Sequence, residues 1–201
     1  KEKFQTISGP HFAMNGISFW EEFGPSALTA KIRAEGMYNF GPSLSPNNAF
    51  YILQGIETLS LRMKKHIENT KMMLEFLKEN EAVSWLRHPD LQDHPDHKIA
   101  KKILPLGSGS IIVFGIKGGR DAGKAFIENV KLSSHLANVG DAKTLLIHPG
   151  STTHSHLSSE AMKMSGLTDD LIRLSVGLED IEDIKIDFEK GFKAAAKISS
   201  K

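Results

Sequence analysis

A long stretch with almost no helix-breaking residues constrains this chain more than any other feature. Residues 47–88 contain no proline and a single glycine, Gly55. Ser45 is a suitable N-cap, and Pro46 fits the first helical turn, where its missing N–H would have no partner anyway. Apolar residues then recur at three- and four-residue steps. The pattern predicts a helix over residues 45–80, on the order of 50 Å long, that links two bodies.

The remaining segments predict a small α+β domain after this helix. Residues 1–44 are rich in Gly, Phe and Pro and indicate irregular structure, with one short helix around 26–38. Residues 81–201 alternate between short apolar runs and amphipathic stretches, which favours a small sheet with helices on one face. Strands are expected at 83–86, 111–113, 144–147 and 171–176, and helices from 121, at 158–165 and from 180.

The last helix has the clearest pattern of charge and hydrophobicity. Glu179 and Asp180 stand at its expected start and lysines at its expected end, as the helix dipole favours. Its apolar residues recur at helical spacing and predict one buried stripe. The members of that stripe are Ile181, Ile184, Phe188, Phe192 and Ala195.

Composition limits the classes of function. The 201 residues carry 25 basic and 24 acidic side chains, a net charge of +1, so no overall field favours nucleic acid or an anionic membrane. The absence of cysteine excludes disulfides, thiolate metal sites and a cysteine nucleophile in this chain. No apolar run approaches the roughly 20 residues of a membrane helix. We therefore expect a cytoplasmic protein, and the polar start without methionine indicates a preceding segment.

Arg173 is the most informative single residue. In DLIRLSVG, residues 170–177, strand alternation places Ile172 and Leu174 on one face and Arg173 with Ser175 on the other. A guanidinium in the middle of an apolar strand needs a carboxylate partner. That partner is either an acidic side chain of the protein, in an internal salt bridge, or the carboxylate of a substrate.

Other polar clusters do not predict a metal or nucleotide site. His148, His154 and His156 follow a strand candidate, but their segment contains no carboxylate to complete a ligand set. The polar residues 94–97 fit turn chemistry. The glycines of residues 115–125 lack the spacing and the Ser or Thr of a phosphate loop. We therefore expect no metal and no nucleotide.

Asn138 has two interpretations. The helix that begins at Asp121 is expected to end at Asn138 and Gly140, which are typical C-cap residues. Alternatively, an amide at the mouth of a strand orients a polar ligand. Lys143, beside the same loop, carries no feature that distinguishes it from a solvated lysine.

Three blocks of sequence together resemble a known family. They are LSPNNAFYILQGIETLSLRMKKH, KLSSHLANVGDAKTLLIHPGSTTHSHLS and DLIRLSVGLEDIEDI. The chain is similar to the Cys/Met-metabolism family of pyridoxal-phosphate (PLP) enzymes, above all to its O-acetylhomoserine sulfhydrylase branch. The resemblance implies the C-terminal part of an aspartate-aminotransferase-like, fold type I enzyme. Residues 1–44 would then join a missing large domain, 45–80 would form the linking helix, and 81–201 the small α+β domain.

The resemblance also assigns substrate-binding residues. Arg173 falls on the family's carboxylate-binding arginine, which favours the substrate interpretation over the internal salt bridge. Asn138 falls where relatives have Ser or Asn beside cofactor and substrate. Thr153 falls where a threonine lines the carboxylate pocket. Ala137 occupies a position at which cystathionine γ-lyases carry a glutamate, which favours sulfide chemistry.

Two departures from the family pattern bear on the entrance to the site. Met14–Gly16 reads MNG where sulfhydrylases usually show Tyr-His-Gly, and Thr144 replaces a common serine. The resemblance therefore implies that substrate contacts near the entrance differ from those of relatives.

The family's main catalytic residues would all lie before Lys1. These are the Schiff-base lysine, the aspartate on the pyridinium nitrogen, the ring-stacking tyrosine and the phosphate-binding residues. The resemblance therefore implies no catalytic residue in this chain and no activity of the chain alone. It implies a homotetramer that binds PLP mainly through an N-terminal portion and makes homocysteine from O-acetylhomoserine and sulfide. The alternatives are a cystathionine γ-synthase or methionine γ-lyase relative, or a non-catalytic domain that retains only the fold.

Overall fold

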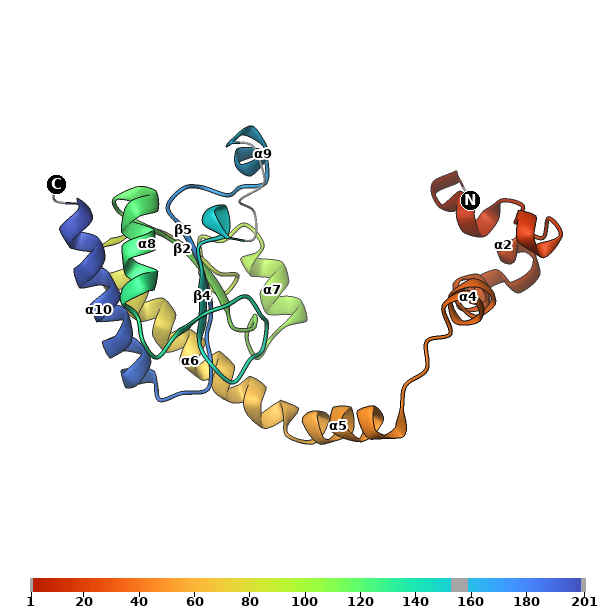
Figure 1. Cartoon of the computed structure of the whole chain (residues 1–201), viewed down its shortest axis with the longest axis horizontal. Helices are drawn as coiled ribbons and strands as arrows, with labels where there is room; N and C mark the ends of the chain where they lie inside the picture. The colour runs from red at the N-terminus through yellow and green to blue at the C-terminus, as the bar shows by residue number, and fades with distance from the viewer. Residues whose placement is uncertain (1, 153–158, 200–201) are drawn as a thin grey trace. The chain divides into compact units, whose positions relative to one another are not determined.

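The chain divides into two compact units. The computed structural model describes residues 2–152 and 159–199 (Figure 1). The units are Lys1–Gly55 and Ile56–Lys201, so the division lies inside the helix predicted over 45–80.

The first unit is built from short helical segments with little core. Phe19 and Ala27 are its buried apolar residues within the described part of the chain. His11 packs edge-on against the Phe19 ring and contacts Glu35, which also pairs with Lys31 at 2.6 Å. The helix predicted around 26–38 is confirmed as a continuous helical run with a π-helical middle. The segments are η1 (Glu2–Phe4), α1 (Gln5–Ser8), η2 (Phe12–Met14), α2 (Phe19–Phe23), η3 (Gly24–Ser26), α3 (Ala27–Lys31), η4 (Ile32–Met37) and α4 (Tyr38–Phe40).

Two helices, α5 (Pro46–Glu57) and α6 (Leu59–Glu79), stand where one long helix was predicted. The N-cap is as expected, because the Ser45 hydroxyl accepts the Asn48 N–H at 3.2 Å. The interruption falls at Thr58, whose ψ of 4° departs from helical geometry. Gly55 and the β-branched Thr58 both have low helix propensity, which explains why the break occurs there.

The second unit contains a five-stranded sheet. In spatial order the strands run β1-β2-β5-β4-β3, and the neighbours are antiparallel except for the parallel pair β3 and β4. The central strand is therefore β5, the last in sequence. The strands are β1 (Val83–Arg87), β2 (Ile111–Ile116), β3 (Ser134–His135), β4 (Leu145–Ile147) and β5 (Leu171–Ser175).

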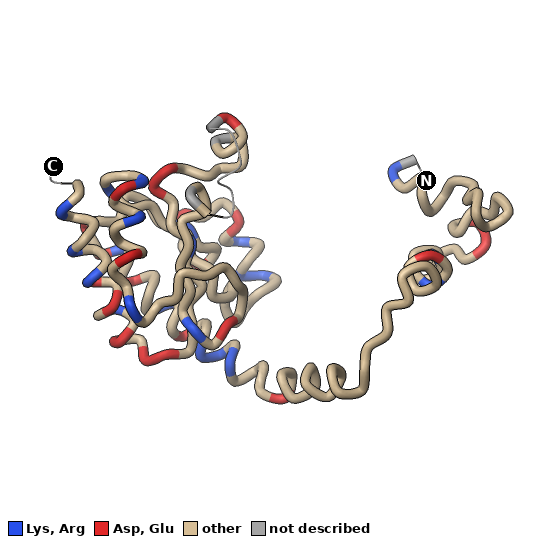
Figure 2. Tube along the Cα trace, viewed as in Figure 1, with Lys and Arg blue, Asp and Glu red and all other residues tan. Residues whose placement is uncertain are grey.

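Helices α8 (Gly119–Asn129) and α10 (Ile181–Ser199) pack together along one face of this sheet (Figure 1). Phe126 of α8 is fully buried, and its ring centroid lies 5.3 Å from that of Phe188 and 4.8 Å from that of Phe192. The buried stripe predicted for the last helix is confirmed. Lysines and acidic residues are interspersed along these helices in Figure 2. The shorter helices are α7 (His97–Ile103), η5 (Pro149–Ser151) and α9 (Ser159–Met164).

The turn expected at 94–97 is confirmed: His94 Nδ1 accepts the Asp96 N–H at 3.1 Å, and the turn leads directly into the helix α7. The end predicted for the helix that begins near Asp121 was wrong. The helix expected to reach Asn138 ends at Asn129, because the buried Asp187 carboxylate accepts the backbone N–H groups of residues 131–133 at 2.7–3.0 Å and turns the chain into β3. Asn138 and Gly140 therefore lie in the loop before β4, and neither is a helix C-cap.

Candidate functional site

Arg173 occupies the middle of the central strand. It pairs with Val113 of β2 on one side and with Ile147 of β4 on the other. Ile172 and Leu174 are fully buried in the core beneath the helices, whereas Arg173 is half-buried on the opposite face. The alternation predicted for this strand is confirmed, and both neighbouring strands fix the Arg173 backbone.

A cavity of about 460 Å³ lies beside Arg173 on that face. Its walls are mostly apolar. Arg173 is the one charged residue among the described residues that line it. An apolar cavity with a single charged group is typical of a site for a small ligand of opposite charge. The lining residues are Val113, Ala137, Asn138, Val139, Ile147, Pro149, Leu167, Leu171 and Arg173.

Arg173 has no protein carboxylate as a partner among the residues that the structure describes. Its Nη2 donates one hydrogen bond, of 3.2 Å, to the Asn138 carbonyl oxygen. The ion pairs of the described chain all involve other residues. The residues outside the described ranges, Lys1, 153–158 (THSHLS) and 200–201, include no acidic side chain. An arginine carries five N–H donors. The internal salt bridge thus finds no support here, and the guanidinium keeps donors for a ligand carboxylate.

Asn138 reaches the site through its backbone and not through its amide. Its Nδ2 donates to Asp141 Oδ2 at 3.2 Å, and its Oδ1 accepts the Val139 N–H at 2.8 Å. Hydrogen bonds from the Lys143 backbone N–H and the Asn138 amide lower the pKa of Asp141 below its usual value. The side chain predicted to orient a ligand therefore orders its own loop, while its carbonyl oxygen contacts Arg173.

Thr144 has a structural role that the sequence did not reveal. It is fully buried, and its hydroxyl donates to Glu179 Oε2 at 2.8 Å and accepts the Gly177 N–H at 2.9 Å. It is not among the residues that line the cavity beside Arg173. The expectation that Thr144 alters substrate contacts at the entrance is therefore wrong. The available signal in the sequence was Glu179, an acidic residue four positions after the buried strand β5, which is the partner of Thr144.

The histidine segment gives no metal site within the described residues. His148 is buried, and its Nε2 lies 2.8 Å from the Asp169 carbonyl oxygen. His154, His156 and the predicted pocket residue Thr153 lie outside the described residues. Across residues 2–152 and 159–199, no three His, Asp or Glu side chains are grouped as metal ligands. Over the same ranges, no helix combines the length and the apolar character needed to cross a membrane.

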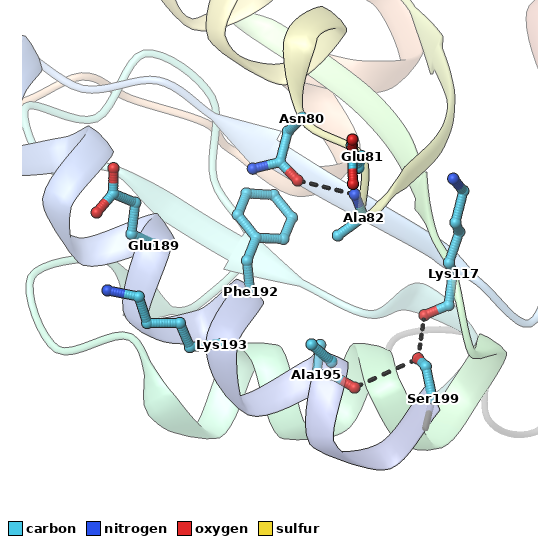
Figure 3. Close-up of a pocket in the computed structure, with 10 residues that line it drawn as sticks. Asn80, Glu81, Ala82, Lys117, Glu189, Phe192, Lys193, Ala195 and Ser199 are labelled. Atoms are coloured by element: carbon cyan, nitrogen blue, oxygen red, sulfur yellow. Dashed lines mark hydrogen bonds between the residues drawn. The ribbon is translucent and has the colours of Figure 1, made fainter. Parts of the chain in front are cut away.

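A second cavity, of about 520 Å³, lies between α10 and the turn from α6 to β1 (Figure 3). Its polar groups hold the local backbone: Asn80 Oδ1 accepts the Ala82 N–H at 2.9 Å, and the Ser199 hydroxyl donates to the Lys117 carbonyl at 2.9 Å. Phe192 and Ala195 contribute apolar surface. The cavity beside Arg173 is the better candidate site, because a half-buried cation on a rigid strand faces it.

Comparison with known proteins gives consistent matches. The profile of the family described as Cys/Met metabolism PLP-dependent enzyme matches residues 6–193. The O-acetyl-L-homoserine sulfhydrylase 1 of Thermus thermophilus is 43% identical over 188 residues, which cover 94% of this chain and 45% of that protein. The chain spans about 45% of the length of the curated relatives that it matches.

Two solved structures resemble the chain. One is a putative O-acetylhomoserine (thiol)-lyase of Campylobacter jejuni, which contains an N'-pyridoxyl-lysine-5'-monophosphate. It has a TM-score of 0.82 and 29% identity, over 96% of this chain and 46% of that one. The other is a cystathionine gamma synthase of Xanthomonas oryzae pv. oryzae, in complex with aminoacrylate and cysteine. It has a TM-score of 0.73 and 33% identity, over 79% of this chain and 41% of that one.

Proposed function

This chain belongs to the Cys/Met-metabolism family of PLP-dependent enzymes, and on that premise we propose that it is the C-terminal portion of an O-acetylhomoserine sulfhydrylase. The complete enzyme would make homocysteine from O-acetylhomoserine and sulfide. The observation that carries this proposal is the half-buried Arg173, which faces an apolar cavity and has no protein carboxylate as partner among the described residues. The similarity to the Thermus sulfhydrylase supports the choice of reaction.

In this proposal Arg173 binds and orients the carboxylate of the amino-acid substrate. A guanidinium holds a carboxylate through two parallel hydrogen bonds, which fix both its position and its plane. The Arg173 backbone is held by strands on both sides, so the bound carboxylate has a rigid reference. Arg173 therefore contributes to the rate by positioning the α-carbon for proton removal, and it transfers no proton itself.

The residues of this chain do not by themselves form a complete binding site for the cofactor. The residues lining the cavity include one arginine, but no lysine, no aspartate and no aromatic ring. These residues fit a substrate carboxylate and do not fit PLP, which, when bound, acts as the electron sink for the reaction. We propose that an N-terminal portion supplies the cofactor-binding residues, including the Schiff-base lysine, so that the chain alone is inactive.

The first unit supports the expectation that the complete enzyme is an assembly. Phe12, Tyr38 and Phe40 are almost fully exposed in this chain. Large exposed apolar groups in such number mark surfaces that another polypeptide covers. We propose that the N-terminal portion and neighbouring subunits cover them. A homotetramer and a cytoplasmic location remain predictions based on the family resemblance.

Two alternatives predict different experimental results. A cystathionine γ-synthase function is favoured by the resemblance to the Xanthomonas structure, and a methionine γ-lyase relative is closely related chemically. Acetate release from O-acetylhomoserine in the presence of sulfide or cysteine, and methionine breakdown, separate these activities. A non-catalytic domain is the other alternative. It predicts a colourless monomer that recruits no second polypeptide when the chain is purified alone.

Substitution of Arg173 tests the proposed role directly. In the complete enzyme, Arg173→Ala removes the charged hydrogen bonds to the substrate carboxylate, and we expect the KM for O-acetylhomoserine to rise on the order of 10- to 100-fold. Arg173→Lys, which keeps the charge without the fork of donors, should give an intermediate KM. The visible absorbance of the bound cofactor should stay unchanged in both variants. A KM for Arg173→Ala equal to that of the unmodified enzyme would disprove the assignment.

A further inference from the structure

We propose that Glu179 is a positioning residue for Arg173, acting through Thr144 and the loop of residues 136–144 that precedes β4. This inference rests on the proposed function, because it assumes that Arg173 binds the substrate carboxylate. Glu179 touches neither the cavity nor Arg173 directly. Its effect is transmitted through a connected set of hydrogen bonds.

The first step is the contact between Glu179 and Thr144. Glu179 Oε1 accepts the Thr144 backbone N–H at 2.7 Å, and Glu179 Oε2 accepts the Thr144 hydroxyl at 2.8 Å. The same hydroxyl accepts the Gly177 N–H. A side chain at Gly177 would collide with the Glu179 carboxylate and with the Thr144 backbone, so the three residues are tightly packed. The carboxylate thereby fixes the C-terminal end of the loop.

The second step is that α6 fixes Glu179 in turn. Asn69 Nδ2 donates to the carbonyl oxygens of Gly177 and Glu179, at 3.0 and 2.9 Å. His66 Nδ1 lies 2.7 Å from the Val176 carbonyl oxygen. Both side chains are buried. The segment between β5 and α10 is therefore bound to a long helix, which makes it a rigid anchor for the Glu179 carboxylate.

The third step leads from the loop to Arg173. The Leu178 N–H donates to the Ala142 carbonyl at 2.8 Å, and Asp141 Oδ1 accepts the Lys143 N–H at 3.0 Å. Asp141 also accepts the Asn138 amide, and the Asn138 carbonyl accepts from Arg173. Every link in this series restrains the loop. The Glu179 carboxylate thus determines where the Asn138 carbonyl meets the guanidinium.

The consequence concerns the conformational freedom of the Arg173 side chain. Strand pairing fixes the backbone of an arginine, but its long side chain keeps considerable rotamer entropy unless an acceptor orients it. The Asn138 carbonyl supplies that acceptor before the substrate binds. If the loop loses its anchor, the guanidinium must be ordered by the substrate, which weakens binding more than it slows the chemical steps.

Thr144→Val and Thr144→Ser form a matched pair for the test. In the complete enzyme, Thr144→Val removes the hydroxyl at similar volume, and we expect the KM for O-acetylhomoserine to rise about tenfold with kcat within about twofold. Thr144→Ser keeps the hydroxyl and should stay within about twofold of the unmodified KM. Glu179→Gln keeps the shape but leaves one Thr144 donor without an acceptor, and should raise KM about three- to tenfold. It also serves as the test if Thr144→Val does not fold.

The same substitutions in an Arg173→Ala background distinguish positioning from general destabilisation. If Glu179 and Thr144 act through Arg173, then Thr144→Val and Glu179→Gln should each change KM by less than about twofold in that background. An undiminished effect there would overturn the inference, as would unchanged KM values in the single variants. An unchanged KM for Arg173→Ala alone would instead reject the proposed function, so the two failures are distinguishable.

Discussion

The two units of this chain differ in how they are stabilised. The unit of residues 56–201 has a continuous core in which the sheet packs against α6, α8 and α10. The unit of residues 1–55 buries only Phe19 and Ala27 among the apolar residues that the structure describes. A core of that size supplies little hydrophobic stabilisation. The difference teaches that residues 56–201 bury a core of their own, whereas residues 1–55 leave most of their large apolar side chains exposed in this chain. The exposed aromatic side chains of residues 1–55 are Phe4, Phe12, Trp20, Phe23, Tyr38, Phe40, Phe50 and Tyr51.

The largest effect should come from separating the units. We expect residues 56–201 expressed alone to unfold in one cooperative transition, because their core is complete within the fragment. Residues 1–55 alone should show weak helical circular dichroism and no cooperative transition. The whole chain is the control, and its main transition should coincide with that of residues 56–201. A cooperative transition of residues 1–55 alone would contradict the conclusion that only the second unit has a core sufficient for independent folding.

The next largest effect on stability should come from replacing one phenylalanine in each unit. Phe126→Ala removes a fully buried ring that packs against Phe188 and Phe192, and should lower the free energy of unfolding by about 3–5 kcal/mol. Phe12→Ala removes a fully exposed ring and should change it by less than about 0.5 kcal/mol. Urea titration of both variants measures the difference. Equal losses would mean that burial does not separate the two units.

The smallest effect on stability should come from replacing a carboxylate in each unit, Asp187 in the second and Glu35 in the first. Burial by itself raises the pKa of Asp187, but hydrogen bonds from the backbone N–H groups of Ser133, Lys131 and Leu132 outweigh it and lower the pKa. A lowered pKa means that Asp187 stabilises the fold above its unfolded-state pKa, and that this stabilisation is lost as the pH falls through the folded-state pKa. Asp187→Asn should therefore lower the free energy of unfolding by about 2 kcal/mol at pH 7. The free energy of unfolding of this variant should also fall less steeply than that of the unmodified chain as the pH is lowered.

Glu35 of the first unit is the matched control for Asp187. The hydrogen bond from Lys31 lowers the pKa of Glu35, but this side chain is only partly buried, so solvent screens the interaction. We expect Glu35→Gln to leave the main unfolding midpoint unchanged at pH 7 and at pH 4. A shift as large as that of Asp187→Asn would show that the first unit contributes to the same cooperative transition.

Features that depend on local pattern were predictable from the sequence. The alternation around Arg173 places it on the face opposite the core, as found, because strand geometry fixes this over a few residues. The buried stripe of α10 follows from helical spacing in the same way. The carboxylate-binding role of Arg173 required the family resemblance, since the local pattern allowed two kinds of partner.

Features that depend on distant partners were not predictable. Asn129 ends α8 because Asp187, more than fifty residues later, binds the following N–H groups. Glu179 was assigned to the start of the last helix, but its carboxylate binds Thr144, 35 residues earlier. The identity of an acidic residue does not reveal which distant donors the fold will bring to it. The same reason explains the incorrect expectation for Thr144.

The strand order has a consequence for synthesis of the protein. The central strand β5 joins β2 to β4, yet it is the last strand to leave the ribosome. Until residues 171–175 emerge, the nascent chain holds two separate half-sheets with exposed edges, which are prone to incorrect pairing. We therefore expect the nascent chain to need protection by chaperones until late in translation. Arg173 arrives with β5, so the candidate carboxylate site and the closed sheet form in the same late event.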